Sequence, residues 1–331
     1  EHSPTVPVTD EAAETTNRWV RRFAIALAVL GIIFRFSGLD TKVFWQDEAH
    51  TGRGIAGSWR TEIMADVFDG EVHTRDELLR HQFPRHDRNI VDVIRLRAIE
   101  EPRQAPLYFV LARSWVLAFG PSIAVLRSFS AVLSVLGLLL VFVLCRELFE
   151  RSTEGWLAVG LIAISPLHIV FAQEARFYML WVDLVLLASW LLLRGGRLAK
   201  SRQHQSGLMF ALYAGTIALA LYCHILTVLV IAAHMAFAVV DERFRWTATL
   251  RFAAAAQLGG ILLFSPWIWF IAQEAKDGPS GWVSWTATPV ATGEWLLGAA
   301  RTYVRPFFDA NTVKLATVQM ALAVVVLVTA T

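Results

Sequence analysis

Two adjacent carboxylates occupy the stretch VFWQDEAHT, where Asp47 and Glu48 follow the aromatic pair Phe44 and Trp45. Because neighbouring residues point apart in both a helix and a strand, the two acids face different surroundings. One carboxylate can then take a proton from a hydroxyl as a general base, while the other binds a metal ion, an arginine or a backbone amide. A pair of ordinary solvated loop acids is the alternative interpretation.

A second group of polar residues lies in SPLHIVFAQEARFYMLW, residues 165–181. Glu174 and Arg176 are expected at a turn between two apolar segments, with Tyr178 just behind them. A structural ion pair that ties two helix ends is the alternative for Glu174 and Arg176, and Tyr178 has the character of a membrane-interface aromatic residue. Asp183 follows Arg176 by two helical turns, so it is expected to face the same way.

The polar segment around the acid pair carries four histidines: His50, His73, His81 and His86. Their spacing matches no zinc motif, and carboxylates suit a hard divalent cation better. If a metal ion is bound, its expected ligands are Asp47, Glu48 and His50; otherwise the histidines are solvated loop residues. His224, near the outer end of a later apolar run, is a supporting candidate if that run lines the site.

The composition of the 331 residues, 56% of them hydrophobic, is that of a membrane protein. Several apolar runs reach the roughly 18 residues that a helix needs to cross a bilayer, which predicts an all-α polytopic fold. Cys145 and Cys223 both lie in such runs and are expected to pack as apolar residues. The chain has no nucleotide-binding loop and no nucleic-acid motif, so nucleic acid is not an expected partner.

The distribution of cationic residues predicts in which direction each apolar run crosses the membrane. About eight spans are predicted: 19–36, 123–145, 155–172, 177–193, 207–222, 225–240, 252–271 and a last run from 314 to Thr331. Arginines precede the first span, and the loops 194–205 and 241–251 are rich in cations, which places these three points in the cytoplasm. The loops 37–122 and 272–313 then lie on the opposite side.

The domain organisation follows from this order. Residues 1–17 are polar and are expected to be a disordered tail, and residues 18–331 form one transmembrane domain. The last run is open-ended, which leaves room for a longer chain. The loop 37–122 is too long for a simple connector, and it contains helical periodicity at 89–100 and an apolar segment at 105–119. Both are expected to be helices at the membrane surface.

Two further arginines, Arg35 and Arg127, are predicted at the outward ends of spans, against the usual distribution of cations. With Arg176 they are candidates for binding a phosphate group, because the planar guanidinium matches phosphate oxygens. Snorkelling to lipid phosphates is the alternative. The pair Ser165-Pro166 is expected to kink or end the third span, since proline cannot continue a helix without loss of a hydrogen bond.

A resemblance joins these segments. The chain has W-x-D-E at 45–48, P-L-Y-F at 106–109, F-G-x-S-x-A-V-x-R-S-x-S-A at 119–131 and S-P-L-H-x-x-x-x-Q-E-A-R-x-Y at 165–178. In this order the motifs resemble the integral-membrane GT-C glycosyltransferases of family 39-like type, which include protein O-mannosyltransferases and aminoarabinose transferases. The resemblance covers roughly 20–270 and is similar in detail to uncharacterised cyanobacterial members. It implies a GT-C fold whose large first outer loop carries amphipathic juxtamembrane helices.

The resemblance also implies a reaction. Such enzymes move a sugar, hexose or pentose, from a polyprenyl-phosphate carrier to an acceptor hydroxyl of a lipid, glycan or protein, outside the bacterial inner membrane. Asp47 maps to the catalytic base with Glu48 beside it, Arg176 contacts the donor phosphate, and Glu174 lies near the same site. No cofactor is certain, and a divalent cation is possible. Many relatives have a histidine where Gln104 stands here, so a role for that histidine is not carried over.

Two other classes remain as alternatives. A transporter or flippase of a lipid-linked sugar would use Arg176 and Asp183 as charges inside the membrane. A structural subunit would keep the fold without activity. The expected gathering of charges at the outer surface, rather than at mid-membrane, favours the enzyme.

Overall fold

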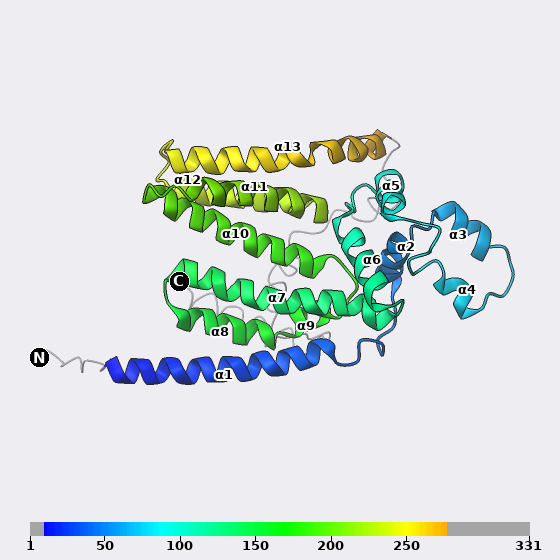
Figure 1. Ribbon diagram of the computed structural model, residues 1–331, viewed down its shortest axis with the longest axis horizontal. Helices are drawn as coiled ribbons and strands as arrows, with labels where there is room; N and C mark the ends of the chain where they lie inside the picture. Colours follow the sequence, from blue (N-terminus) through cyan, green and yellow to red (C-terminus); the bar gives the residue numbers. More distant parts are fainter. Residues whose placement is uncertain (1–9, 277–331) are drawn as a thin grey trace, which may run out of the picture.

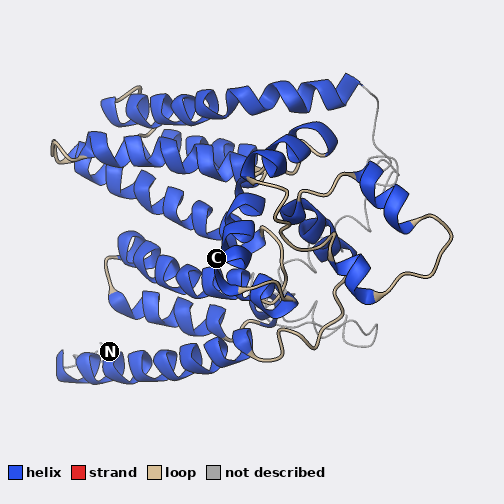
Figure 2. Ribbon diagram, turned by 45° about the vertical axis from the view of Figure 1, so that its right-hand side comes forward, coloured by secondary structure: helices blue, strands red, loops and turns tan. Residues whose placement is uncertain are grey.

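The structure, a computed structural model, describes residues 10–276, and in that range every regular element is a helix (Figure 2). The helices are α1 (Asp10–Phe36), α2 (Gln46–Ala56), α3 (Arg60–Val67), α4 (Arg75–Leu79), α5 (Ile90–Glu100), α6 (Leu107–Phe119), α7 (Ile123–Phe149), α8 (Ser152–Ala163), α9 (Pro166–Ala172), α10 (Tyr178–Lys200), α11 (Ser206–Cys223), α12 (Thr227–Asp241) and α13 (Ala248–Lys276). The all-α polytopic prediction is confirmed.

The long helices lie side by side, and the short helices gather at one end of them (Figure 1). Neighbours in this layer are α1 with α8, α8 with α7, α7 with α10, α10 with α11, and α11 with α13. Helices α2 to α6 form a cap over one end of the bundle, as Figure 1 shows. The segment 37–122 therefore contains an ordered helical unit, and the expected helices at 89–100 and 105–119 are confirmed as α5 and α6.

Fewer helices meet the length and composition of a membrane span than the sequence predicted. Within residues 10–276 four qualify, namely α7, α10, α11 and α13, or five if the bent pair α8–α9 is one span. Helix α12 has only 15 residues, and α1 carries Arg21, Arg22 and Arg35. The predicted spans 19–36 and 225–240 therefore do not qualify, and the run from 314 lies outside the described residues.

The predicted break in the third span is confirmed at Ser165-Pro166. Helices α8 and α9 meet there at an angle of 66°. The break frees the last carbonyl groups of α8, which find no water in an apolar layer. Arg35 satisfies them: its Nη1 donates to the Ala163 carbonyl and its Nη2 to the Ile162 carbonyl at 3.1 Å. A side chain from the first helix thus stabilises the broken one.

The position of Arg35 corrects two expectations. Its side chain is fully buried, and its Nε donates to Ser134 Oγ at 2.7 Å. The guanidinium is therefore turned into the bundle, away from both a donor phosphate and the lipid headgroups.

Replacing Arg35 with leucine is expected to lower the free energy of unfolding by about 2–4 kcal/mol, because buried carbonyl groups lose their donors. Arg21→Leu is the matched control, since Arg21 lies exposed on the same helix. The midpoint of thermal unfolding of the purified protein in detergent measures both. Equal midpoints for the two variants would show that Arg35 does not hold the break together.

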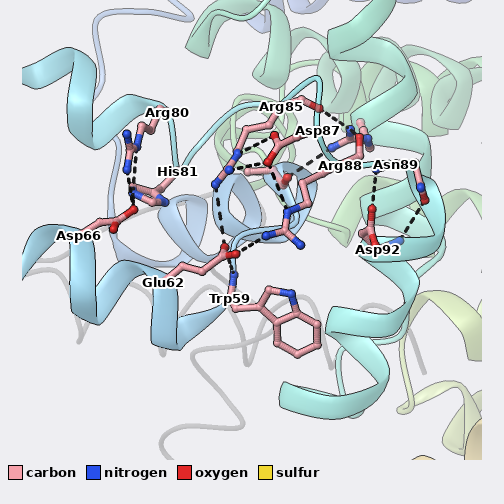
Figure 3. A network of polar contacts seen from close by, with 12 residues as sticks. Trp59, Glu62, Asp66, Arg80, His81, Arg85, Asp87, Arg88, Asn89 and Asp92 are labelled. Carbon is pink, nitrogen blue, oxygen red and sulfur yellow. Dashed lines mark hydrogen bonds and ion pairs between the residues drawn. The ribbon is translucent and has the colours of Figure 1, made fainter.

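Ion pairs hold the outer loop together between α3 and α5 (Figure 3). The Glu62 carboxylate accepts the Trp59 backbone N–H at 3.0 Å and pairs with Arg88, with Arg85 3.9 Å away. From the other side, the buried guanidinium of Arg113 donates to the Arg88 carbonyl and to the Arg85 carbonyl, the latter at 3.2 Å. These contacts fix the loop between α4 and α5 against α6.

The histidines of the outer loop differ from the expectation of solvated side chains. His81 is 2% exposed and its Nε2 lies 3.5 Å from Asp66 Oδ2, and burial lowers the pKa of its imidazole (Figure 3). His73 pairs with Asp69 at 2.9 Å. Among His73, His81 and His86, only His86 is exposed as expected.

Candidate active site

Helix α2 begins at Gln46, so Asp47 and Glu48 fall in its first turn, where negative charge interacts favourably with the helix dipole. The two carboxylates point to different surroundings, as the sequence predicts for neighbours. The Glu48 side chain is 1% exposed and that of Asp47 is 18% exposed. Glu48 therefore belongs to the interior and Asp47 to the surface of the site.

Glu48 is held by two distant segments. Its Oε1 accepts the Arg127 Nε–H at 2.8 Å and the Ala175 backbone N–H at 2.9 Å, and its Oε2 lies 2.6 Å from Arg127 Nη2. This bidentate, buried pair joins α2, α7 and the turn before α10. Both Glu48 oxygens are thereby held by an arginine and a backbone amide, as the sequence predicts for one acid of the pair.

Arg127 is equally saturated. Besides Glu48, its Nη1 donates to the carbonyls of Leu39 at 2.7 Å and Lys42 at 3.1 Å, and its Nη2 donates to the Val43 carbonyl at 3.0 Å. All five N–H groups of a guanidinium are thereby used. A donor phosphate would have to displace protein partners, so the expected phosphate contact of Arg127 is corrected to a structural role: it fixes the chain that leads into α2.

Arg176 lies next to Asp47. It sits in the turn between α9 and α10, and its Nη1 donates to the Asp47 carbonyl at 3.0 Å and to Thr51 Oγ1 at 3.3 Å. Its Nη2 lies 3.7 Å from Asp47 Oδ2. The Arg176 Nε is buried and has no hydrogen-bond partner among residues 10–276. Unlike Arg127, this guanidinium has an N–H group without a partner among the described residues.

Glu174 lies in the same turn, half-buried, and forms no ion pair with Arg176 within 4 Å in the part of the chain described. Its Oε2 is buried without a hydrogen-bond partner there. Burial first, and then the nearby Glu48 charge, raise the pKa of the Glu174 carboxyl. The ion pair considered from the sequence is therefore absent from the described residues, and the pKa of the Glu174 carboxyl lies above its ordinary value.

This raised pKa predicts a pH effect on stability. A carboxyl with a raised pKa in the folded state destabilises the fold above that pKa and ceases to do so as the pH falls toward its ordinary value of 4.5. Glu174→Gln is therefore expected to match or exceed the stability of the parent at pH 7, with the difference shrinking toward pH 4.5. Thermal unfolding of both proteins across this range measures it, and a difference independent of pH would contradict the assignment.

The expected metal ligands are not brought together. Glu48 faces Arg127, and His50 Nδ1 lies 3.8 Å from Glu101 Oε1. Burial is the main cause that lowers the pKa of His50. Within residues 10–276 no three His, Cys, Asp or Glu side chains are grouped as metal ligands. Asp47, Glu48 and His50 therefore have three different sets of neighbours.

Aromatic side chains surround the Arg176 guanidinium. It lies 5.0 Å from the Phe177 ring and 5.9 Å from the Tyr178 ring. The centre of the His224 ring lies 4.7 Å from that of Phe177 and 5.0 Å from that of Trp181, with the rings tilted against one another. Burial and then the Arg176 charge lower the pKa of His224. The two supporting residues predicted, Tyr178 and His224, thus lie around Arg176.

Asp183 does not join this group. Because Arg176 lies in the turn before α10, the two-turn spacing does not apply to the pair. Asp183 is buried against α7, where its Oδ1 would lie 2.8 Å from a methyl group placed on Gly137. The gating pair that a transporter was expected to form from Arg176 and Asp183 is therefore not seen.

The structure adds a charged group that the sequence analysis missed. Glu101 pairs with Arg53 on α2 and lies 2.5 Å from Arg97 Nη2 on α5, and it is also the partner of His50. Arg97 is fully buried over the Phe109 ring, at 4.2 Å. The signal was present, since Arg97 and Glu101 are one helical turn apart and Arg97 falls on the apolar face of α5.

Comparison with known proteins gives the class to which this fold and site belong. Residues 103–270 match the family described as dolichyl-phosphate-mannose-protein mannosyltransferase, and this covers just over half of the chain. The chain belongs to that family, and it is an integral-membrane glycosyltransferase of the GT-C type. Searches of curated proteins and of solved structures found no match. The matched segment includes Arg127, Glu174 and Arg176 and begins after Asp47.

Proposed function

We propose that this protein transfers a sugar from a polyprenyl-phosphate carrier to an acceptor hydroxyl, with inversion at the anomeric carbon and Asp47 as general base. The observation that supports this most is the pair of Asp47 and Arg176. An accessible carboxylate lies 3.7 Å from a guanidinium with an unused donor, at the capped end of a membrane bundle. The acceptor is a lipid, a glycan or a protein hydroxyl.

The proposed step is a single displacement. Asp47 takes the proton of the acceptor hydroxyl, and the acceptor oxygen forms a bond to the anomeric carbon. The bond from that carbon to the phosphate oxygen breaks, and polyprenyl phosphate leaves with the electron pair. A phosphate leaves as a stable anion, so the site needs positive charge at the leaving group more than it needs a proton donor.

Arg176 supplies that charge in the proposal. Its Nη1 is anchored on the Asp47 carbonyl, and its Nε, which has no partner among residues 10–276, is proposed to donate to a phosphate oxygen of the bound donor. The same anchor fixes the distance between base and cation. Glu48 and Arg127 act one step further away, since they hold α2 against α7 and the turn that contains Arg176.

The proposed location is the inner membrane of a bacterium, with the N-terminus in the cytoplasm and the cap of α2 to α6 outside. The cation-rich loops 194–205 and 241–251 support this side assignment. In the same proposal, residues 1–17 are a tail, and residues 18–331 form one transmembrane domain with outer loops 37–122 and 272–313. Most of the second loop lies outside the described residues.

The experiment supplies the purified protein with radiolabelled polyprenyl-phosphate mannose, and separately with nucleotide-linked mannose, together with lipid, glycan and peptide acceptors. Transfer from the lipid-phosphate donor alone is the expected result, and a chelator arm reports any need for a divalent cation. Transfer from the nucleotide donor, or movement of intact lipid-linked sugar across a vesicle without transfer, would overturn the proposal.

A further inference from the structure

A cavity lies between the ends of α10 and α12 and the start of α13. These helix ends lie at the end of the bundle away from α2, as Figure 1 shows. Its volume is about 170 Å³. One part of its wall is apolar, from Leu193, Phe237 and Ala253, and another part is charged, from Lys200 and Glu242 among others. The transfer site involves none of these residues.

Two acids at the cavity share one cation. Arg197 also lines it but is occupied by Glu147, at 3.2 Å, and by Glu150, at 3.0 Å. Lys200 then pairs with two acids: its Nζ lies 2.7 Å from Asp241 Oδ2 and 3.2 Å from Glu242 Oε1.

The carboxylate of Glu242 is the group most in need of a donor. The side chain is 8% exposed, and its Oε1 faces Lys200 without a well-directed hydrogen bond. The C-terminal ends of α10 and α12 add partial negative charge at the same place. This wall of the cavity therefore favours a further cation that can donate hydrogen bonds.

Another wall favours an anion. Helix α13 starts at Ala248, and Thr249 in its first turn lines the cavity. The N-terminal end of a helix carries partial positive charge and backbone N–H groups that suit phosphate oxygens. A ligand with an ammonium group and a phosphate group a few atoms apart matches both walls.

The loop between α12 and α13 indicates what surrounds the cavity. Phe244 is 79% exposed and Trp246 is 70% exposed, and they alternate with Arg243 and Arg245. Exposed aromatic and basic residues together are typical of the lipid headgroup layer. Phe237, 44% exposed, continues the cavity toward the apolar surface of the bundle. Residues of these kinds are found where a phospholipid headgroup meets its acyl chains.

We propose that this cavity binds the headgroup of an ethanolamine phospholipid. The primary ammonium donates to Asp241 and Glu242, and the phosphate lies against Lys200 and the start of α13. A primary ammonium has three N–H donors, whereas a choline headgroup has none and a glycerol headgroup has no cation. The charge pattern therefore selects ethanolamine over both.

The test is native mass spectrometry of the purified full chain after titration with phosphatidylethanolamine, phosphatidylcholine and phosphatidylglycerol of identical acyl chains. The first is expected to remain bound at about tenfold lower lipid concentration than the other two. Equal retention of the three lipids, or preference for phosphatidylglycerol, would overturn the proposal, and this comparison needs no variant.

A variant locates the site. Glu242→Gln is expected to remove the preference for phosphatidylethanolamine, while Glu71→Gln, an exposed acid of the outer loop, is expected to keep it. Both proteins are compared with the parent for mannose transfer, which is expected to continue. A preference retained in Glu242→Gln would place the lipid elsewhere and contradict the assignment.

Discussion

Glu48→Gln is expected to lower the free energy of unfolding by about 3–5 kcal/mol, because it leaves the Arg127 guanidinium buried without a counter-charge. The pair is deeply enclosed, with both side chains 1% exposed. A glutamine at 48 would also turn an N–H group toward the Arg127 donors or the Ala175 N–H. The midpoint of thermal unfolding in detergent, followed by helical circular dichroism, measures the loss.

A second change separates the buried charge from the lost contacts. Combining Glu48→Gln with Arg127→Met removes the unpaired cation, so part of the stability is expected to return. The return is incomplete, because Arg127 also donates to the carbonyls of Leu39, Lys42 and Val43. If Glu48→Gln unfolded at the temperature of the parent, the pair would not be the structural junction described here.

The apolar runs predicted the helices of the bundle correctly where a run had both the length and the composition of a membrane span. The limits of α7, α10, α11 and α13 lie within seven residues of the predicted limits. The prediction exceeded the structure at α12, which is too short, and at α1, which is too charged by the same measure. The limits of an apolar run alone do not give the first and last residues of a helix.

The break at Pro166 can be predicted from the local sequence, but the contact that stabilises it cannot. A proline removes one backbone donor wherever the helix lies, so the sequence predicts the break. The guanidinium that stabilises it comes from Arg35, more than a hundred residues earlier in the chain. No local pattern relates the two, and the arginine therefore resembled a ligand for phosphate.

The acid pair shows the same limit inside the site. Adjacency predicted that Asp47 and Glu48 would face apart, and the structure has this arrangement. Which acid is buried depends on Arg127 of α7 and on Ala175 of the turn before α10, which both donate to Glu48. The resemblance supplied the order of the motifs, and the packing shows which of their charges are already paired.

Asp47→Asn is expected to lower the rate of sugar transfer by about 10²–10⁴-fold, because the proposed reaction loses its general base. Asparagine has the same shape but cannot take a proton from the acceptor. The Arg176 Nη1 bond to residue 47 uses the backbone carbonyl and persists in the variant. Folding and the KM for the lipid-phosphate donor are therefore expected to change little.

The most direct measurement is the initial rate of label transfer from polyprenyl-phosphate mannose at saturating donor, for the parent, Asp47→Asn and Asp40→Asn in one preparation. Asp40 is an exposed acid of the same loop and serves as the matched control. The account predicts transfer by the parent and by Asp40→Asn and its near-complete loss in Asp47→Asn. Transfer by Asp47→Asn at the rate of the parent would contradict the proposal that Asp47 takes the proton.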